Sequence, residues 1–513
     1  CEKKKINVFL PHPREKEMWW IVFLCFILGG LYWRYAHRRS GEPPLVAGIW
    51  FWGVANEFGK NAKLLLQECK AKHGPVFTLV VAGQRMTMIC DSSASSKFFR
   101  HNRLDFERFG YGVSEKAFGH TFQGSMAVAK TSKPLTTKNL LGSGLPALQV
   151  AFAKELYSLL GLPSSKKRDG LEQVQKLENG SWSLYDFISV LVFGSSTEAL
   201  WGNGFYNAAV LDDFRSVDDA FILLIAGVPS FVPAVKKAKQ ARARLAAYIG
   251  GQTSGGAIPR PNISDYMMDR FDLFTQFLSP HDAAHFNVSI LWAALANTIP
   301  AVFWTLLYIL KHPKVLAAVQ KELEDVRLSL KGTSGDDQAS ALATLLSESG
   351  PGEKSQTELL DSCVLESLRL SSASLVVRMV EEDTTVDLPA ALGGPIKCRK
   401  GDQVCLVPIL YHNNEEVYGE GSSSNFQPFR KWTKEETDNL MPFGGGVSMC
   451  PGRKLARSEI KLVVATLLLN FDLKLDAPDD PLPDFDVARA SLGILPPAPA
   501  SKPVGFTFSP IGK

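Results

Sequence analysis

Residues 443–452 read FGGGVSMCPG, and they constrain the architecture of this chain more tightly than any other ten residues. Three consecutive glycines let the backbone come close to a large, flat partner. Cys450 ends this loop just before an amphipathic helical pattern at 452–470, and the backbone N–H groups of a helix N-terminus stabilise a thiolate over a thiol. A lone buried cysteine is usually an inert small hydrophobe, but the spacing F-x-x-G-x-x-x-C-x-G favours a ligand.

The composition is that of an ordinary globular chain. Of its 513 residues, 45% are hydrophobic and 21% are charged, with 41 Gly and 30 Pro. These values exclude a disordered chain, a collagen-like chain and a protein with many membrane spans, and the length allows a large core around a ligand cavity. The net charge of +4, without a long basic block, argues against a nucleic-acid partner. Eight cysteines without a C-x-x-C pair argue against a zinc ribbon and fit a reducing compartment.

An uncharged apolar run from Trp19 to Trp33 predicts a single N-terminal membrane anchor. The run has about 15 residues, fewer than the roughly 20 that span a bilayer, but aromatic residues at both ends extend it into the interfaces. A cleaved signal peptide and a buried core helix are the alternatives, and no small-residue cleavage site follows the run. The positive cluster that comes next places the rest of the chain on the cytosolic side; it consists of Arg34, His37, Arg38 and Arg39.

Residues 41–44, GEPP, predict a hinge after the anchor, because two prolines cannot continue a helix. The predicted organisation is therefore an extension and anchor at 1–40 and one catalytic domain at 41–513. The sequence begins with Cys1, so we expect the natural start to be Met18, directly before the apolar run.

The body reads as mainly helical with a minor β part. Residues 75–90 predict two strands around a Gly83-Gln84 turn, and residues 331–357, rich in Gly, Ser, Asp and Glu, predict an exposed loop. Residues 286–310 hold no charge, which fits either a buried central helix or a second membrane span. Helical periodicity covers 147–160, 231–249, 357–370 and 452–470, and strand-like pieces continue to about residue 410.

Two further motifs precede the cysteine loop. Residues 366–369, ESLR, place Glu366 and Arg369 on one helix face, and residues 426–430, FQPFR, end with Arg430. E-x-x-R alone occurs by chance in many helices, and a surface ion pair contributes little. The three motifs in this order, however, resemble those of the cytochrome P450 family.

The resemblance implies the cytochrome P450 fold, a haem b cofactor, and Cys450 as the thiolate ligand of the haem iron. Further cofactor contacts are implied for Phe443, Gly446 and Gly452, and Arg378 matches an arginine that pairs with a haem propionate. A buried structural triad is implied for Glu366, Arg369 and Arg430. The chain departs from the family at Ser448, where a basic residue is frequent, and in lacking a recognisable W-x-x-x-R segment.

Residues 294–298, ALANT, resemble the family pattern A-G-x-[DE]-T, with Asn297 in place of the acid. Pro300 has no N–H, so the carbonyl of Ala296 loses its helix partner and a kink is predicted. The resemblance implies that dioxygen binds at the kink, where Thr298 passes protons and Asn297 holds a water. The alternative is a plain kink with a threonine that bonds back to its own helix.

Residues 291–304, LWAALANTIPAVFW, residues 366–375, ESLRLSSASL, and residues 492–497, LGILPP, are among the segments that resemble a narrower branch, the cholesterol and oxysterol 7α-hydroxylases. The resemblance covers about 41–513 and is thin between 121 and 285. It implies a monooxygenase that hydroxylates a sterol, with carbon 7 as the expected position. Sterol 12α-hydroxylases and the prostacyclin-synthase type of peroxide isomerase are the related alternatives, and a haem carrier or sensor is the non-enzyme alternative. The implied substrate contacts are Leu291, Ala294, Ser374, Leu375 and Leu492.

The resemblance also implies the partners of the chain. Electrons would come from NADPH through a separate cytochrome reductase, because no nucleotide-binding fingerprint occurs in the sequence. Arg453, Lys454 and Arg457 follow Cys450 and fit a basic docking face, although basic residues also serve helix solubility. With a sterol substrate, dioxygen and membrane lipid as further partners, we expect the endoplasmic reticulum membrane as the location, with the catalytic domain facing the cytosol.

Overall fold

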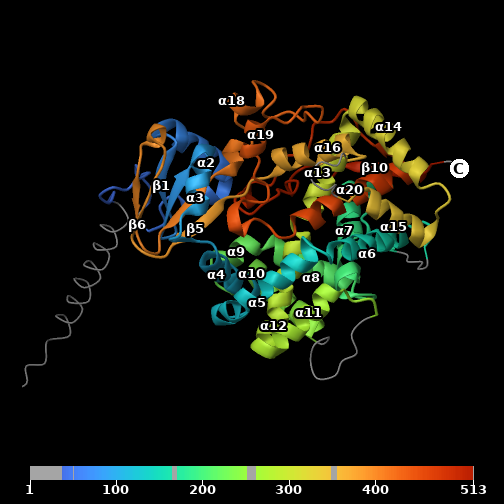
Figure 1. Cartoon of the computed structure of the whole chain (residues 1–513), viewed down its shortest axis with the longest axis horizontal. Coiled ribbons are helices and arrows are strands. Elements are labelled where there is room, and N and C mark those ends of the chain that lie inside the picture. Colours follow the sequence, from blue (N-terminus) through green and yellow to red (C-terminus); the bar gives the residue numbers. More distant parts are fainter. Residues whose placement is uncertain (1–36, 50, 165–169, 251–260, 348–354, 512–513) are drawn as a thin grey trace, which may run out of the picture. The chain divides into compact units, whose positions relative to one another are not determined.

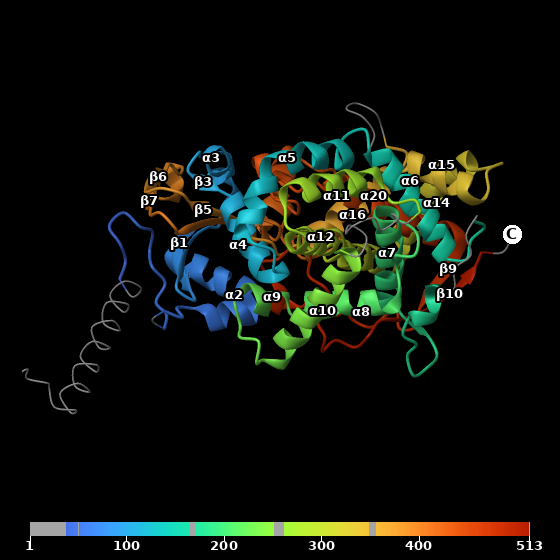
Figure 2. The ribbon, with the colours of Figure 1, turned by 90° about the horizontal axis from the view of Figure 1, so that it is seen from below.

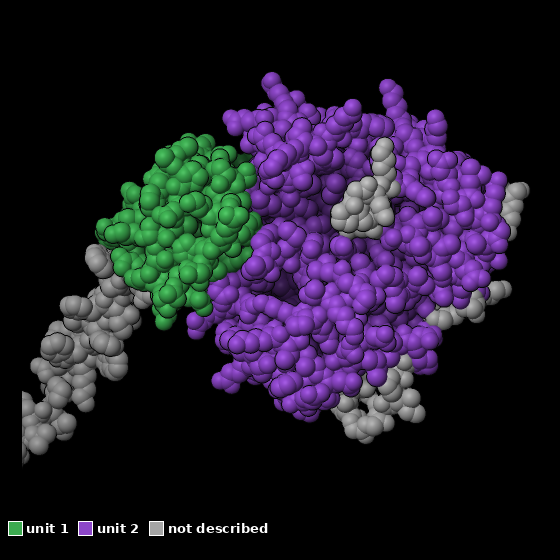
Figure 3. Space-filling model, viewed as in Figure 1, with its two compact units in different colours: residues 1–104, 378–406 green, residues 105–377, 407–513 purple. Residues whose placement is uncertain are grey.

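The computed structural model describes residues 37–49, 51–164, 170–250, 261–347 and 355–511. The chain divides into two compact units, drawn in different colours in Figure 3. Unit 1 comprises the described residues up to Leu104 together with Arg378–Leu406, and unit 2 comprises Asp105–Val377 and the chain from Val407 onward. The apolar run Trp19–Trp33 predicted as the anchor lies outside the described residues.

Unit 1 is built around a five-stranded sheet with the order β1-β2-β8-β5-β3. The two predicted strands at 75–90 are confirmed, and Val76 pairs with Ile89. The turn lies one residue earlier than predicted, at Ala82 and Gly83, because Gln84 already pairs with Val81; the φ values of 49° and 80° give the left-handed turn that hairpins favour. The elements of this unit are α2 (Ala55–His73), β1 (Val76–Val81), β2 (Gln84–Ile89), α3 (Ser95–Arg100), β3 (Leu104–Asp105), β5 (Val376–Val380), β6 (Thr384–Val386), β7 (Ile396–Cys398) and β8 (Gln403–Leu406).

Unit 2 is mainly helical, with one small sheet of order β4-β10-β9 (Figure 1). Its first half contains α4 (Glu107–Phe118), α5 (Phe122–Leu140), α6 (Leu145–Leu159), β4 (Trp182–Ser183), α7 (Leu184–Trp201), α8 (Ala208–Asp219), α9 (Phe221–Ile225), α10 (Pro233–Gly250), α11 (Asp265–Phe277) and α12 (Pro280–Leu295). Its second half contains α13 (Thr298–Lys311), α14 (Pro313–Ser329), α15 (Gly335–Leu345), α16 (Glu358–Ser371), α17 (Pro408–Tyr411), α18 (Glu415–Tyr418), α19 (Lys434–Asn439), α20 (Arg453–Asn470), β9 (Phe471–Leu475) and β10 (Gly505–Pro510).

Helix starts follow local capping chemistry. The side chains of Asn207, Ser264 and Ser279 accept hydrogen bonds from the first turns of α8, α11 and α12. At α19, Thr433 and Glu436 form a complete capping box. The predicted helices at 147–160, 231–249, 357–370 and 452–470 correspond to α6, α10, α16 and α20, and so are confirmed.

The core of unit 2 centres on α13, which packs against α7, α16 and α20. Every residue from Thr298 to Leu310 is buried, so this helix is enclosed on all sides. Within the described residues, Pro280–Lys311 is the one helical stretch long and apolar enough to cross a membrane, and 67% of its most apolar window is buried inside the protein. Of the two predictions for 286–310, this burial favours the central core helix.

The prediction of an exposed loop at 331–357 is wrong for part of that range. Residues Gly335–Leu345 form α15, which packs against α6 and buries Ala339, Leu342 and Ala343. These three residues recur at helical spacing inside a polar segment. Their burial against α6 stabilises a helix that the Gly, Ser and Asp content disfavours.

One carboxyl group lies deep in this core. Glu459 on α20 is 4% exposed and accepts a hydrogen bond of 3.1 Å from the Ser196 hydroxyl of α7. Burial raises the pKa of Glu459 to about 8, so the folded protein holds this carboxyl protonated at neutral pH.

We therefore expect Glu459 to make stability depend on pH. Its contribution is complete below the pKa of the carboxyl in the unfolded chain and is lost as the pH rises towards about 8. In Glu459→Gln, the thermal unfolding midpoint should depend less on pH across this window. On the alkaline side of the window it should lie about 2 °C above the wild-type midpoint. Glu324→Gln, at an exposed position on α14, is the control. Equal pH profiles for wild type and Glu459→Gln would contradict the assignment.

Candidate active site

The loop around Cys450 is closed by one backbone hydrogen bond. The N–H of Cys450 donates to the carbonyl of Phe443 at 3.0 Å, and α20 begins three residues later. Gly444 and Gly446 have φ values of 69° and 66°, in the left-handed region where a side chain would be strained. The glycines are therefore required by the path of the loop itself.

The surroundings of the Cys450 sulfur are compatible with its being a metal ligand. Six cysteines are described, all of them free, and Cys450 is the one among them that is not fully buried. Burial raises the pKa of its thiol, while the backbone N–H groups of Gly452 and Arg453 and the charge of Arg453 act in the opposite direction. A half-buried cysteine that receives backbone N–H donors at a helix N-terminus fits the thiolate that a haem iron requires.

The structure brings the predicted triad together. Arg369 donates from Nε and Nη2 to the two carboxylate oxygens of Glu366 at 2.9 and 2.8 Å, and both side chains are 0% exposed. Arg430 lies 3.4 Å from Glu366 and also pairs with Glu436. The remaining acceptors of the Arg369 guanidinium are four carbonyl oxygens, which belong to His412, Ser422, Ser423 and Asn425.

His412 links this triad to the cysteine loop, and nothing in the sequence singled it out. Its carbonyl accepts from Arg369, while its Nε2 accepts the N–H of Met441 at 2.9 Å. Burial and the nearby charge of Arg369 lower the pKa of His412 to about 3, so the ring stays neutral and keeps its acceptor nitrogen. Met441 lies two residues before Phe443, so this bond fixes the start of the loop.

We expect Arg369→Lys to destabilise unit 2 by about 3–5 kcal/mol, because an ammonium group cannot replace the bidentate fork and leaves Glu366 buried without its full set of donors. The urea midpoint of the purified protein and its yield with bound haem measure the effect. Arg103→Lys, in an exposed pair with Glu382, should change the free energy of unfolding by less than about 1 kcal/mol. A wild-type midpoint in Arg369→Lys would show that the triad is not structurally required.

The predicted kink is present as a break in the helix. α12 ends at Leu295 and α13 begins at Thr298, with Pro300 in the first turn of α13. The hydroxyl of Thr298 donates to the carbonyl of Ala294 at 2.8 Å, which is the back-bonded arrangement. Its oxygen lone pairs remain available as acceptors beside the interrupted turn.

The implied substrate residues lie on elements that meet around this break. Residues 491–495 pair with the chain after α16, where Ser374 bridges to Ser491 and the N–H of Leu375 donates to Ser491 at 3.4 Å. Ser374, Leu375 and Leu492 are thus brought together in unit 2. Ala294 is half-buried on α12, whereas Leu291 is fully buried in the main core.

Arg378 belongs to unit 1, where it is 5% exposed. Its guanidinium carbon lies 5.5 and 5.8 Å from the ring centroids of Phe98 and Phe99. Its pairing with a haem propionate stays a prediction. The haem contacts of Phe443, Gly446 and Gly452 stay predictions in the same sense.

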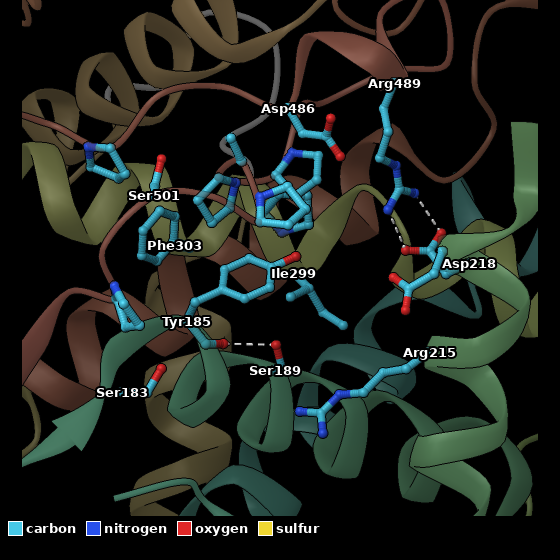
Figure 4. Close-up of a pocket in the computed structure, with 18 of the residues that line it drawn as sticks. Ser183, Tyr185, Ser189, Arg215, Asp218, Ile299, Phe303, Asp486, Arg489 and Ser501 are labelled. Atoms are coloured by element: carbon cyan, nitrogen blue, oxygen red, sulfur yellow. Dashed lines mark hydrogen bonds and ion pairs between the residues drawn. The ribbon is translucent and has the colours of Figure 1, made fainter. Parts of the chain in front are cut away.

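A cavity of about 310 Å³ lies beside the broken helix (Figure 4). Ile299 and Phe303 of α13 line it together with Tyr185 of α7. At one end Arg489 donates to both oxygens of Asp218 at 2.8 and 2.7 Å. This bidentate pair ties the segment before Leu492 to the end of α8.

Comparison with known proteins agrees with this geometry. A family model described as Cytochrome P450 matches residues 234–500, and rat cytochrome P450 7A1 is 31% identical over 489 residues, which cover 90% of this chain and 92% of the relative. The chain belongs to the cytochrome P450 family. Two further relatives each cover 90% of the chain and 92% of their own length: cholesterol 7-alpha-monooxygenase of Cricetulus griseus, 31% identical, and human 7-alpha-hydroxycholest-4-en-3-one 12-alpha-hydroxylase, 29% identical.

Membership in the cytochrome P450 family settles the class of chemistry. The protein is an oxidoreductase of the monooxygenase type that uses haem, with electrons supplied by a reductase partner. Its helical architecture with a minor β part is the fold of this family.

We expect Cys450→Ala to abolish the red-shifted Soret band that thiolate ligation gives the reduced carbon monoxide complex. The absorbance difference spectrum of the purified protein measures this directly. Cys363→Ala, which removes a buried thiol elsewhere in unit 2, should keep the band. A Cys450→Ala protein that retains both the band and full activity would exclude this cysteine as the ligand.

Proposed function

We propose that this cytochrome P450 hydroxylates a sterol, with the 7α position as the site of attack. The proposal is supported by relatives that match nine tenths of the chain, among them a cholesterol 7-alpha-monooxygenase and a 7-alpha-hydroxycholest-4-en-3-one 12-alpha-hydroxylase. The segments 366–375 and 492–497, which are paired in the structure, are among those that resemble the 7α branch. We also propose that the N-terminal apolar run anchors the enzyme in the endoplasmic reticulum membrane.

Bound haem supplies the oxidising chemistry. The residues of this chain bind the haem and transfer protons to the reacting oxygen. Cys450 provides the sulfur ligand at the end of the closed loop, and the Glu366–Arg369 pair keeps that loop in place through His412. Thr298, at the broken turn, would release its bond to the Ala294 carbonyl, donate that hydrogen towards dioxygen and take a proton back from a water that donates to its oxygen.

Thr298 favours a monooxygenase over a peroxide isomerase of the prostacyclin-synthase type, because isomerisation needs no proton delivery to dioxygen. Sterol 12α-hydroxylation is the second candidate, since the relatives of that activity are 29–30% identical, close to the 31% of the 7α relatives.

Incubation with a sterol panel tests the proposal. The membrane-bound enzyme is combined with a reductase, NADPH and cholesterol, 25-hydroxycholesterol, 27-hydroxycholesterol or a 7α-hydroxylated sterol, and products are identified by mass spectrometry. A 7α-hydroxysterol formed only with NADPH supports the proposal. A 12α product replaces it with the second candidate, and peroxide isomerisation without NADPH-dependent sterol oxidation contradicts both.

We expect Thr298→Ala to leave haem binding and sterol affinity nearly unchanged and to lower product formed per NADPH consumed by about tenfold, with the lost electrons appearing as hydrogen peroxide. Product, NADPH and peroxide are measured in the same reaction. Thr305→Ala is the matched control, because Thr305 lies two turns further along α13 and makes the same bond to the carbonyl four residues back. Wild-type coupling in Thr298→Ala would remove this hydroxyl from proton delivery.

A further inference from the structure

Asn297, at the break between α12 and α13, makes a contact outside its own helix. Its side-chain oxygen accepts the backbone N–H of Ile494 at 2.9 Å. Ile494 is 197 residues away in the sequence and belongs to the segment 491–495. The one side-chain acceptor of Asn297 is therefore used to hold a piece of backbone.

The same contact explains why residue 493 is a glycine. A Cβ atom built on Gly493 would lie 2.1 Å from the Asn297 oxygen, far inside contact distance. Gly493 has no left-handed φ, so its lack of a side chain is explained by the close approach of Asn297. Asn297 and Gly493 are thus mutually dependent.

The opposite edge of the segment is held by the chain that follows α16. Ser491 N–H donates to the carbonyl of Ala373 at 2.7 Å, Ala373 N–H donates to Gly493 at 2.8 Å, and Leu495 N–H donates to Ser371 at 2.9 Å. Ile494 forms an antiparallel bridge with Ser372, and beside such a bridge successive N–H groups point to opposite edges. The N–H of Ile494 therefore faces away from Ala373, and Asn297 supplies its acceptor.

A second side chain of the broken helix reaches the end of the segment. Trp304 on α13 donates from Nε1 to the carbonyl of Leu495 at 2.7 Å, and its ring is buried. The segment is therefore fixed on one side by the end of α16 and on the other by α13. Leu492 lies between these attachment points.

We propose that Asn297 is a positioning residue, which fixes the segment 491–495 against the helix break and so sets where Leu492 meets the substrate. In this role the amide acts through Ile494 and Gly493, whereas proton delivery belongs to Thr298. The consequence for the reaction is the choice of the carbon that is oxidised. The inference requires a monooxygenase of this family and does not depend on which sterol it takes.

Hydrogen exchange of the haem-loaded enzyme tests the contact without any substrate. Asn297→Ala should speed exchange of the Ile494 amide about fivefold or more, the loss of one net hydrogen bond. Gly493→Ala should do the same, because its methyl group displaces the Asn297 oxygen. Asn297→Asp keeps an acceptor oxygen and should exchange as slowly as wild type. Gly112→Ala is the control, since a Cβ there meets no atom within 4 Å.

Product analysis on the accepted substrate tests the consequence. Asn297→Ala and Gly493→Ala should raise the share of minor hydroxylation products several-fold, while Asn297→Asp and Thr305→Ala keep the wild-type distribution. Unchanged Ile494 exchange in Asn297→Ala overturns the contact. Faster exchange with an unchanged product distribution overturns the positioning role. If the sterol panel yields no product, the exchange experiment still decides the contact, so failure of the proposed function and failure of this inference are distinguishable.

Discussion

The ion pair between Glu366 and Arg369 is the interaction on which the structure of unit 2 around the cysteine loop depends. Both side chains are completely buried, and a buried ion pair is stable only when its remaining donors and acceptors also form hydrogen bonds. The four carbonyls that complete the Arg369 guanidinium come from a segment without long helices, between His412 and Asn425. One buried guanidinium thus organises a stretch of chain that could not organise itself by helix propensity.

The order imposed by that pair extends to the ligand loop. His412 uses its carbonyl for Arg369 and its ring for Met441, and burial keeps the ring neutral so that it can accept. From Met441 the chain runs directly into the glycine-rich turn that ends at Cys450. Cys450, the proposed ligand, is therefore held by a chain of hydrogen bonds that begins on α16, while α20 follows it on the other side.

The broken central helix, α12 followed by α13, both forms the core of unit 2 and carries polar groups at its break. Its second half, α13, is enclosed by apolar side chains on every side and gives unit 2 its core. At the interruption before Thr298, the Thr298 hydroxyl bonds to Ala294 and Asn297 holds the 491–495 segment, and we propose that the same hydroxyl takes part in proton delivery. The Asp218–Arg489 pair, seen in Figure 4, attaches the chain just before this segment to α8, which packs on α10 (Figure 2).

Local patterns were enough for those features whose cause is local. The glycines and cysteine of 443–452, the E-x-x-R face, the proline that interrupts the central helix and the hairpin at 75–90 all follow from backbone sterics or from residue spacing, and the structure contains each of them. Three other features could not be read in this way. α15 forms in a polar segment because Leu342 and its neighbours are buried against α6. His412 is a single histidine with no motif around it, and the pairing of Asn297 with Ile494 joins residues almost two hundred positions apart. A hydrogen bond or a buried face of this kind exists only after the chain has folded, because folding alone brings the two partners into contact and removes the water that would otherwise satisfy them.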